Sequence, residues 1–289
     1  MNSKYTQFKT ALILLCLCFP VFSGASTLPK ANPVPGGIVI VPLDVKSIEA
    51  PIVKFKMNRV LVAPATNEPQ KWVAVVGIPL DAKSGKHEIN VTSNGQKQKV
   101  PFTIKKKKYK TQHITIKNKR KVNPTKKDLE RIGKEKKTIV ASLKTWRASP
   151  EINTKFVIPV KGRLSSPFGL RRFFNKQPRK PHSGIDIAAP EGTPIVSPAA
   201  GVILSTGNYF FNGNSIFIDH GQGLVTMYCH MSKINVKPGQ HVAQGEKIGA
   251  IGKTGRVTGP HLHWAVSLND ARVDPGLFFD DLAKLAKKK

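Results

Sequence analysis

Two histidines stand one residue apart in the stretch "TGPHLHWAV", residues 258–266. In an extended strand, residues i and i+2 point to the same face, so His261 and His263 would project side by side. Imidazole is the commonest metal ligand in proteins, but histidine is also a common surface residue. This stretch alone therefore leaves two interpretations open: a pair that serves a metal site, or the end of a surface strand.

A second stretch, "HSGIDIAAPEGTPI" at residues 182–195, adds a carboxylate. The apolar neighbours of Asp186 predict that it is buried, and a buried carboxylate needs a cation or strong hydrogen-bond donors. His182 lies four residues earlier, and Gly184 between them allows the backbone to fold closely. His182, Asp186 and one histidine of the pair at 261 and 263 would supply two imidazoles and one carboxylate. That donor set is typical of a catalytic zinc site, whose fourth position is open to water.

Other kinds of metal site fit the sequence less well. A structural zinc site is usually closed by four ligands that include cysteines, and Cys229 is the single cysteine after residue 25. The chain contains no His-Glu-x-x-His motif, so the glutamate base of helical zinc proteases is absent. We therefore expect chemistry at an open metal site, with a base other than that glutamate.

Residues from about 160 to 278 resemble the lysostaphin/LytM-type zinc endopeptidases of peptidoglycan. Three motifs carry the resemblance in the order of that family: "SSPFGLRR" with "HSGIDIAAP", then "TMYCHMS", then "TGPHLHWAV". The resemblance implies that His182, Asp186 and His263 bind one Zn²⁺ ion per chain. It also implies that His230 and His261 are the catalytic histidines, which activate water and stabilise the oxyanion at the scissile carbonyl.

Three further residues are candidates for substrate binding. Arg171 in "FGLR" and Asn214 in "NGNS" lie where the family lines its cleft, and each could position substrate or simply fix a loop. Tyr209, in an aromatic run with the next two residues, could form a wall of the groove if it is exposed. Of the remaining histidines, we expect His220 to brace a turn and His241 to be exposed.

The chain as a whole predicts a mainly β protein in two parts. Residues 26–122 contain short β-branched runs between turn signals such as Asn94-Gly95, which predicts a small N-terminal β-sandwich-like domain. Residues 158–289 are punctuated by glycine and predict an antiparallel β catalytic domain. The N-terminal part is also similar to the β domain that precedes the catalytic domain in some exported Gram-negative members of the family.

Residues 123–157 are expected to form a helix and a linker between these parts. The pattern predicts an amphipathic helix over residues 124–146, capped by Asn123, with Pro124 in its first turn. We expect its apolar stripe to pack on a neighbouring domain. The stripe consists of Leu129, Ile132, Ile139, Val140, Leu143 and Trp146.

The N-terminus has the pattern of a secretory signal peptide, which we place at residues 1–25. Two lysines precede the apolar run at residues 11–22, and the small residues "SGAS" follow it. The apolar run is too short for a comfortable membrane span. We therefore expect an exported monomer in the periplasm or cell envelope, with no membrane span once the signal has been removed.

The charge of the chain is large, positive and unevenly distributed. Residues 156–289 carry 17 basic and 8 acidic residues, and two lysines precede residue 26, so residues 26–155 hold +19 of the total net charge of +30. Such a field attracts polyanions. The predicted export argues against a specific nucleic-acid partner, and we expect peptidoglycan and the anionic envelope surface instead. The cluster "IKKKKYKTQHITIKNKRK", residues 104–121, could be a docking surface or only a solvated face.

The sequence therefore predicts an exported zinc metalloendopeptidase that hydrolyses peptide bonds in peptidoglycan stems or crosslinks. The similarity to exported Gram-negative members favours D-alanyl–diaminopimelate crosslinks over glycine bridges. The alternative is a catalytically inactive LytM-type protein that activates another cell-wall hydrolase. Such proteins usually lose metal ligands, whereas all five key positions are filled here.

Overall fold

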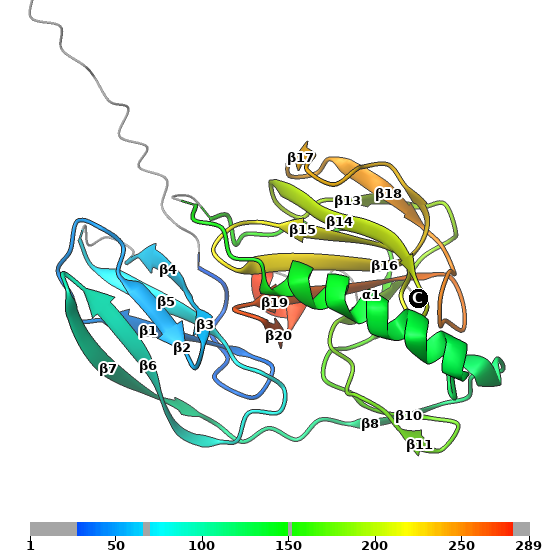
Figure 1. Cartoon of the computed structure of the whole chain (residues 1–289), viewed down its shortest axis with the longest axis horizontal. Helices are drawn as coiled ribbons and strands as arrows, with labels where there is room; N and C mark the ends of the chain where they lie inside the picture. Colours follow the sequence, from blue (N-terminus) through cyan, green and yellow to red (C-terminus); the bar gives the residue numbers. More distant parts are fainter. Residues whose placement is uncertain (1–27, 66–69, 150–151, 280–289) are drawn as a thin grey trace, which may run out of the picture.

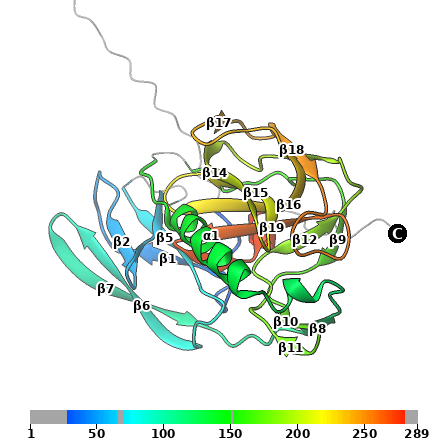
Figure 2. The ribbon, with the colours of Figure 1, turned by 45° about the vertical axis from the view of Figure 1, so that its right-hand side comes forward.

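The computed structural model describes residues 28–65, 70–149 and 152–279, and the predicted signal peptide lies outside them. The prediction of a mainly β protein is confirmed, since most elements of the described residues are strands. The strands form two groups of sheets, and one long helix lies between these groups in the sequence. The N-terminal strands, blue to cyan, lie at one end of the molecule, and the larger sheet, yellow to red, lies at the other (Figures 1 and 2).

Two small antiparallel sheets form the N-terminal sandwich. Their strand orders are β1-β5-β4 and β3-β2-β6-β7. The strands are β1 (Ile38–Leu43), β2 (Ile52–Phe55), β3 (Asn58–Arg59), β4 (Leu61–Pro64), β5 (Trp72–Gly77), β6 (Gly85–Ser93) and β7 (Gln96–Ile104). Asn94 and Gly95 join β6 to β7 with φ of 50° and 75°, the backbone of a two-residue hairpin turn that the Asn-Gly pair predicts.

The middle strand β5 is buried on both faces. On one face, Ala74 and Val76 lie in the core between the two small sheets. On the other face, Val73 and Val75 join the main core, which also contains Leu268 of the larger sheet. Because side chains alternate across a strand, β5 contributes to two separate cores, and its outward face joins the sandwich to the larger domain through the main core.

Two amide side chains of the larger domain add hydrogen bonds to this contact. Asn269 accepts a hydrogen bond from the Gly77 N–H at 2.6 Å and donates one to the Gly77 carbonyl at 3.0 Å. Gln222 accepts one from the Val62 N–H at 2.9 Å. These bonds satisfy backbone groups of β4 and β5, and they hold the two domains in one arrangement.

The chain between the two domains runs alongside the larger one. β8 (Thr111–Ile114) pairs in parallel with β10 (Arg171–Phe174), which pairs with β11 (Gln177–Pro178). A short 3-10 helix, η1 (Lys119–Lys121), leads to α1 (Lys126–Lys144). The helix α1 lies against β14 of the larger sheet (Figure 1).

The helix differs from its prediction at the start and in its packing. Its N-cap is Thr125 rather than Asn123, because Thr125 and Asp128 form a reciprocal capping box. Leu143 is buried against the sheet, whereas Leu129 is 56% exposed, so the apolar stripe packs mainly toward its C-terminal end. Within the described residues, no helix has the length and apolar character needed to cross a membrane.

The larger sheet has the central order β17-β14-β15-β16-β19-β12-β9, with β13, β18 and β20 paired at its sides. All of its pairings are antiparallel, as the sequence predicts. Its elements are β9 (Arg163–Ser166), β12 (Ile185–Ala188), β13 (Pro194–Val196), β14 (Gly201–Tyr209), β15 (Gly213–Asp219), β16 (Leu224–Ile234), β17 (His241–Val242), β18 (Lys247–Ile251), β19 (His261–Leu268), β20 (Ala271–Val273) and η2 (Pro275–Phe278).

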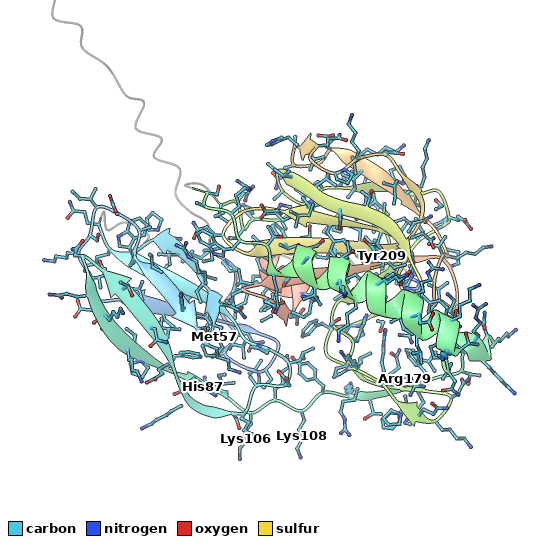
Figure 3. All side chains as sticks on the ribbon, viewed as in Figure 1. Met57, His87, Lys106, Lys108, Arg179 and Tyr209 are labelled. Atoms are coloured by element: carbon cyan, nitrogen blue, oxygen red, sulfur yellow. The ribbon has the colours of Figure 1, made fainter. Side chains whose placement is uncertain are left out.

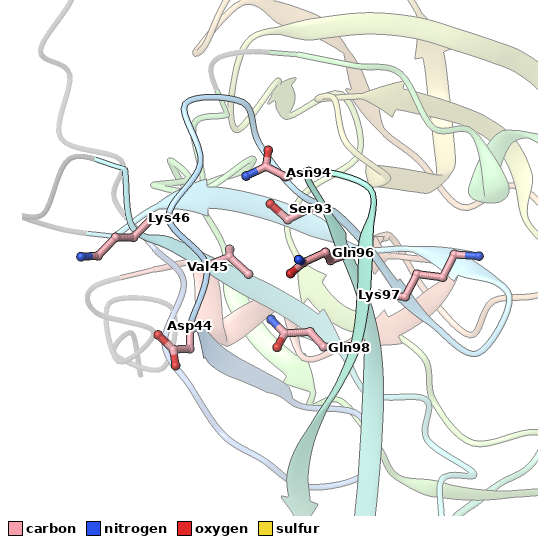
Figure 4. A pocket seen from close by; sticks show the side chains of 8 residues that line it. All are labelled: Asp44, Val45, Lys46, Ser93, Asn94, Gln96, Lys97 and Gln98. Atoms are coloured by element: carbon pink, nitrogen blue, oxygen red, sulfur yellow. The ribbon is translucent and has the colours of Figure 1, made fainter.

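A polar pocket of about 240 Å³ lies on the N-terminal sandwich, between the β6–β7 hairpin and the chain after β1 (Figure 4). Asp44 supplies its only carboxylate, and no histidine lines it. The pocket therefore lacks the donors of a transition-metal site, and the chemistry-bearing residues lie on the larger sheet.

His220 is buried in that sheet as a neutral imidazole. Its Nδ1 lies 2.8 Å from the Ala200 carbonyl, which can only accept, so Nδ1 carries the hydrogen and donates it. Its Nε2 then accepts from the Thr226 hydroxyl at 2.8 Å. Burial lowers the pKa of His220 to about 4. These bonds join the turn after β15 to β16 and to the start of β14, which agrees with the bracing role expected from the sequence.

We predict that His220 makes the protein acid-sensitive. A histidine in the unfolded chain has a pKa of about 6.5, whereas the pKa of buried His220 is about 4. Between these two values, the unfolded state binds a proton and the folded state does not. Between pH 7 and pH 5, this group should lower the free energy of unfolding by about 2 kcal/mol. Urea unfolding at both pH values measures the effect. His220→Gln should be less stable at pH 7 but lose less stability on acidification, and an unchanged pH dependence would contradict the assignment.

Candidate metal centre and catalytic groove

Three neighbouring strands and one loop carry the predicted ligands. β12 and β19 pair antiparallel, with Asp186 directly opposite His263. β16 pairs with the other edge of β19, with Cys229 opposite His263. His182 lies in the loop just before β12. The sheet therefore brings the two distant motifs together at one place, where β16, β19 and β12 lie side by side (Figure 2).

Within the described part of the chain, His182, Asp186 and His263 form the one group that could hold a metal ion. Asp186 Oδ1 lies 2.7 Å from His263 Nδ1 and 2.9 Å from His182 Nε2, and the two nitrogens are 3.1 Å apart. A tetrahedral zinc ion with bonds of about 2.0–2.1 Å would set its ligand atoms about 3.3 Å apart. The donor atoms thus fit such an ion after outward shifts of a few tenths of an ångström.

Contacts behind the ligands orient two of the imidazoles. His182 Nδ1 donates to the Pro167 carbonyl at 2.8 Å, so Nε2 is the nitrogen that would bind a metal. The ring of His263 lies against the backbone at Gly184, where a Cβ atom would come within 2.9 Å of His263 Cε1. Glycine at this position is therefore required for the ring to reach the centre.

Burial and charge both keep the centre ready for a cation. Burial alone would raise the pKa of Asp186, but the hydrogen bonds with His182 and His263 outweigh it and hold the pKa well below its usual range. Burial lowers the pKa of His263 to about 4, against the opposing attraction of Asp186. At neutral pH the carboxylate is ionised and the His263 ring is neutral, which are the forms that bind a metal.

A bulge in β16 aims His230 at the same centre. Tyr228 pairs with Ile216 and Met231 pairs with Asn214, so Cys229 and His230 stand opposite a single residue of β15. His230 also has φ of 68°, a left-handed conformation that a non-glycine residue adopts only when its surroundings impose it. Bulges beside active sites commonly redirect a side chain in this way.

Among the described residues, no group lies at hydrogen-bond distance from one ring nitrogen of His230 and one ring nitrogen of His261. His230 Nδ1 donates to the Thr254 carbonyl at 2.9 Å, and His261 Nδ1 donates to the Gly259 carbonyl at 2.8 Å. The two ring centroids are 4.9 Å apart, and His261 Nε2 lies 4.0 Å from Asp186 Oδ1. Burial, with the neighbouring histidines, holds the pKa of His230 well below its usual range. His230 is therefore a neutral imidazole, able to accept a proton beside the metal ligands.

The three predicted substrate-binding residues have different environments. Arg171 is exposed on β10. Asn214 donates to the Met231 carbonyl at 3.0 Å and accepts from the Asn208 side chain at 2.8 Å, contacts that fix the loop beside His230. Tyr209 is only 7% exposed and packs with Leu143 under α1 (Figure 3), so the exposure needed for it to line a groove is absent.

The structure adds two residues that sequence reasoning missed. Arg172 donates through Nη2 to Asp186 Oδ2 at 2.7 Å, and Gln112 of β8 accepts from Arg172 Nε at 3.2 Å. Both line a pocket of about 230 Å³ beside the metal ligands, together with His261. The sequence offered one indication of Arg172: side chains alternate along a strand, so Arg171 and Arg172 point to opposite faces and only one of them can face the metal ligands.

A three-donor metal centre, open on the side of two unengaged imidazole nitrogens, defines the arrangement of a metal-dependent hydrolase. Comparison with known proteins identifies the family. The model of peptidase family M23 matches residues 180–275, and that of the M23 N-terminal domain matches residues 31–107. A crystal structure assigned to peptidase M23, from Pseudomonas aeruginosa, is 41% identical with a TM-score of 0.73, and the match covers 86% of this chain and 95% of that one. The chain belongs to peptidase family M23.

Two curated relatives match the C-terminal part. The peptidoglycan DD-endopeptidase ShyA of Vibrio cholerae is 46% identical over 111 residues, which are 38% of this chain. The DD-carboxypeptidase/endopeptidase Mpg of Neisseria meningitidis is 44% identical over 113 residues, or 39% of this chain. In each case the match spans 26% of the relative's own length. The family assignment agrees with the resemblance inferred from the sequence.

We predict that His230→Ala and His261→Ala retain the metal but lose hydrolysis. Neither side chain is among the three predicted ligands, whereas general acid–base assistance is typically worth about 10²–10⁴-fold in rate. Metal content by elemental analysis and the rate of peptidoglycan digestion test the two halves of the prediction. His241→Ala is the matched control, because His241 is exposed on β17. Digestion at the wild-type rate by either variant would remove that histidine from the catalytic pair.

Proposed function

We propose that this chain is an exported zinc metalloendopeptidase that hydrolyses peptide bonds in peptidoglycan stems or crosslinks. The D-alanyl–diaminopimelate bond is the favoured target, and a glycine bridge is the second candidate. The membership in peptidase family M23 and the peptidoglycan endopeptidases among the relatives support this substrate class. The predicted signal peptide at residues 1–25 supports action in the periplasm or cell envelope.

The observation that carries the proposal is the meeting of three donors and two further imidazoles at one point of the sheet. Two nitrogens and one carboxylate oxygen match the ligands of catalytic zinc and leave a coordination position open. When bound, zinc supplies a Lewis acid that polarises a carbonyl and lowers the pKa of water to roughly 7. His182, Asp186 and His263 would hold the ion.

The two remaining imidazoles would move the protons of the reaction. His230 is neutral, its Nδ1 donates to the Thr254 carbonyl, and its ring centre lies 6.1 Å from that of His263, so its Nε2 would take a proton from the attacking water. Its neighbour His261 donates Nδ1–H to the Gly259 carbonyl, and its Nε2 lies 4.0 Å from Asp186 Oδ1. In the protonated, imidazolium form, this Nε2 would donate to the oxygen that gains charge at the scissile carbonyl. The assignment of the two roles could be exchanged without changing the geometry.

The alternative, an inactive activator of another hydrolase, receives less support. An activator needs neither an intact ligand set nor oriented acid–base groups, so nothing would preserve them. In this chain the ligand atoms lie within 4.8 Å of one another, and both further histidines are held by backbone carbonyls. A strained backbone at His230 would also have no purpose in a protein that only binds.

We predict that Asp186→Ala loses zinc and with it the release of crosslinked peptides from sacculi. Without the carboxylate, two imidazoles remain as ligands, too few for a catalytic zinc site. Elemental analysis gives the zinc content, and mass spectrometry of the released muropeptides identifies the bond cleaved by the wild-type protein. Full zinc occupancy in Asp186→Ala would refute the ligand set. Intact sacculi after incubation with the zinc-loaded wild type would refute the enzymatic function.

The basic connecting segment is expected to bind the anionic cell envelope. Five lysines are exposed between β7 and β8: Lys105, Lys106, Lys107, Lys108 and Lys110. Lys106 and Lys108 are labelled in Figure 3. Peptidoglycan stems carry free carboxylates, and exposed charges attract each other within the screening length of about 8–10 Å at physiological ionic strength. Since this segment leads directly into β8 beside the groove, docking there would bring the metal centre close to the wall.

We predict that the protein sediments with sacculi at low salt and is released as salt is raised. Replacing the five lysines at 105–108 and 110 by glutamine should remove much of this binding, because each contributes a screened charge. The matched control replaces five exposed lysines of α1, at 126, 127, 134, 136 and 137, by glutamine. Equal losses in both variants would indicate a general charge effect, and salt-independent sedimentation would show that the segment is only a solvated face.

A further inference from the structure

Arg172 touches the proposed metal centre from behind. Its Nη2 donates to Asp186 Oδ2 at 2.7 Å and to Ser166 Oγ at 3.1 Å. Its Nε donates to Gln112 Oε1 at 3.2 Å. The guanidinium group is planar and rigid, so three contacts along its edge fix its orientation as well as its position. The side chains of Arg172 and Asp186 are only 16% and 10% exposed, which limits competition from water.

The two oxygens of Asp186 therefore have different partners. Oδ2 is bound to Arg172, while Oδ1 faces His182 and His263 at 2.9 and 2.7 Å. A carboxylate that is free to rotate could offer either oxygen, or both, to a metal. With Oδ2 engaged, only Oδ1 is presented, and the carboxylate acts as a one-atom ligand in a fixed direction.

The support for Arg172 comes from outside the catalytic sheet. Gln112 lies on β8, directly opposite Arg172 in the parallel β8–β10 register. Along β8, Gln112 and Ile114 are partly buried and line the pocket beside the metal ligands, whereas Thr111 and His113 are exposed. Both Gln112 and Arg172 lie between residues 107 and 180, outside the two segments that match the family models.

We propose that Arg172 is a positioning residue for the metal ligand Asp186 and that Gln112 holds Arg172 in place. The connector between the two domains thereby forms part of the metal centre. This inference rests on the proposed metal site but not on the identity of the substrate. It concerns how tightly and in what geometry the chain binds zinc.

Arg172 has two opposing effects on zinc affinity, and the proposal predicts which of them is larger. A cation next to the site repels a divalent metal, so removal of the charge by itself would strengthen zinc binding. Loss of the hydrogen bonds would leave Asp186 Oδ2 unpartnered and free to turn, which weakens zinc binding. Loss of an outer hydrogen-bond partner typically costs about 10–100-fold in metal affinity. If positioning is the role of Arg172, the second effect exceeds the first.

The test measures the zinc dissociation constant of the full chain by competition with a chelator, with no peptidoglycan present. Arg172→Met should raise the constant by about 10-fold or more. Arg172→Lys, which retains the charge but lacks the fork, should fall between Met and the wild type. Arg163→Met is the matched control, since Arg163 is an exposed cation on β9, which pairs with the strand of Asp186. A constant within twofold of the wild type in Arg172→Met, or a tighter one, would overturn the proposal.

The contribution of Gln112 is tested separately. Gln112→Ala should weaken zinc binding in the native chain but not in the Arg172→Met background, because the two residues act through one contact. Thr111→Ala, on the exposed face of the same strand, is its control. Equal effects of Gln112→Ala in both backgrounds would show that Gln112 acts independently of Arg172.

A spectroscopic measurement separates positioning from a general loss of stability. The visible absorption of the Co²⁺-loaded protein depends on coordination number, so it should change in Arg172→Met if Asp186 rotates. Far-UV circular dichroism identifies a variant that fails to fold, and Gln112→Ala then carries the test alone. A Co²⁺ spectrum identical to that of the wild type, in a folded Arg172→Met protein, would overturn the positioning role. If the zinc affinities follow the prediction but the zinc-loaded wild-type protein does not digest sacculi, the proposed enzymatic function is rejected and the positioning role of Arg172 is retained.

Discussion

The buried carboxylate of Asp186 is the constraint on which the rest of the site depends. An ionised carboxylate removed from water is costly unless donors or a cation compensate. Here two imidazoles contact one oxygen and a guanidinium contacts the other. The strand pairings supply these groups, since β19 brings His263 directly opposite Asp186 and β10 carries Arg172, which donates to the Asp186 carboxylate.

The shared core explains why the connector can take part in the site. Because β5 is buried on both faces and Asn269 bonds to its last residue, the sandwich does not move freely against the larger domain. The chain that leaves the sandwich after β7 therefore starts from a defined point and reaches β10 along a defined path. A flexible tether could not hold Gln112 at hydrogen-bond distance from Arg172. The N-terminal domain thus contributes to the metal centre through geometry, without touching a ligand itself.

The sequence predicted local features well and distant ones poorly. His182 and Asp186 are four residues apart and His261 and His263 two apart, so short spacing and family motifs predicted them as site residues, and the structure brings them close together. The Gln112–Arg172 contact joins residues 60 apart, and no local pattern encodes it. The bulge at His230 also escaped prediction, because it depends on how β15 and β16 align. Tyr209 was misjudged for a related reason: an aromatic run does not reveal which ring the helix α1 will cover.

The segments that contribute to the site are rich in basic residues and lack acidic ones. Residues 105–123, 161–181 and 252–263, each of which contributes to the pocket that Asp186 lines, contain 18 lysines and arginines and no aspartate or glutamate. Aromatic rings and carbonyls compensate part of this charge: the guanidinium of Arg256 lies 4.6 Å from the Phe174 ring centre and 4.3 Å from that of Phe211. Burial, with Arg172 and Arg179 nearby, still lowers the pKa of Arg256 to about 10. In the pocket beside the predicted ligands, Asp186 is the only carboxylate, so no other acid of that lining competes with it for Arg172 or for a metal ion. The same distribution gives the residues around this pocket a positive electrostatic potential.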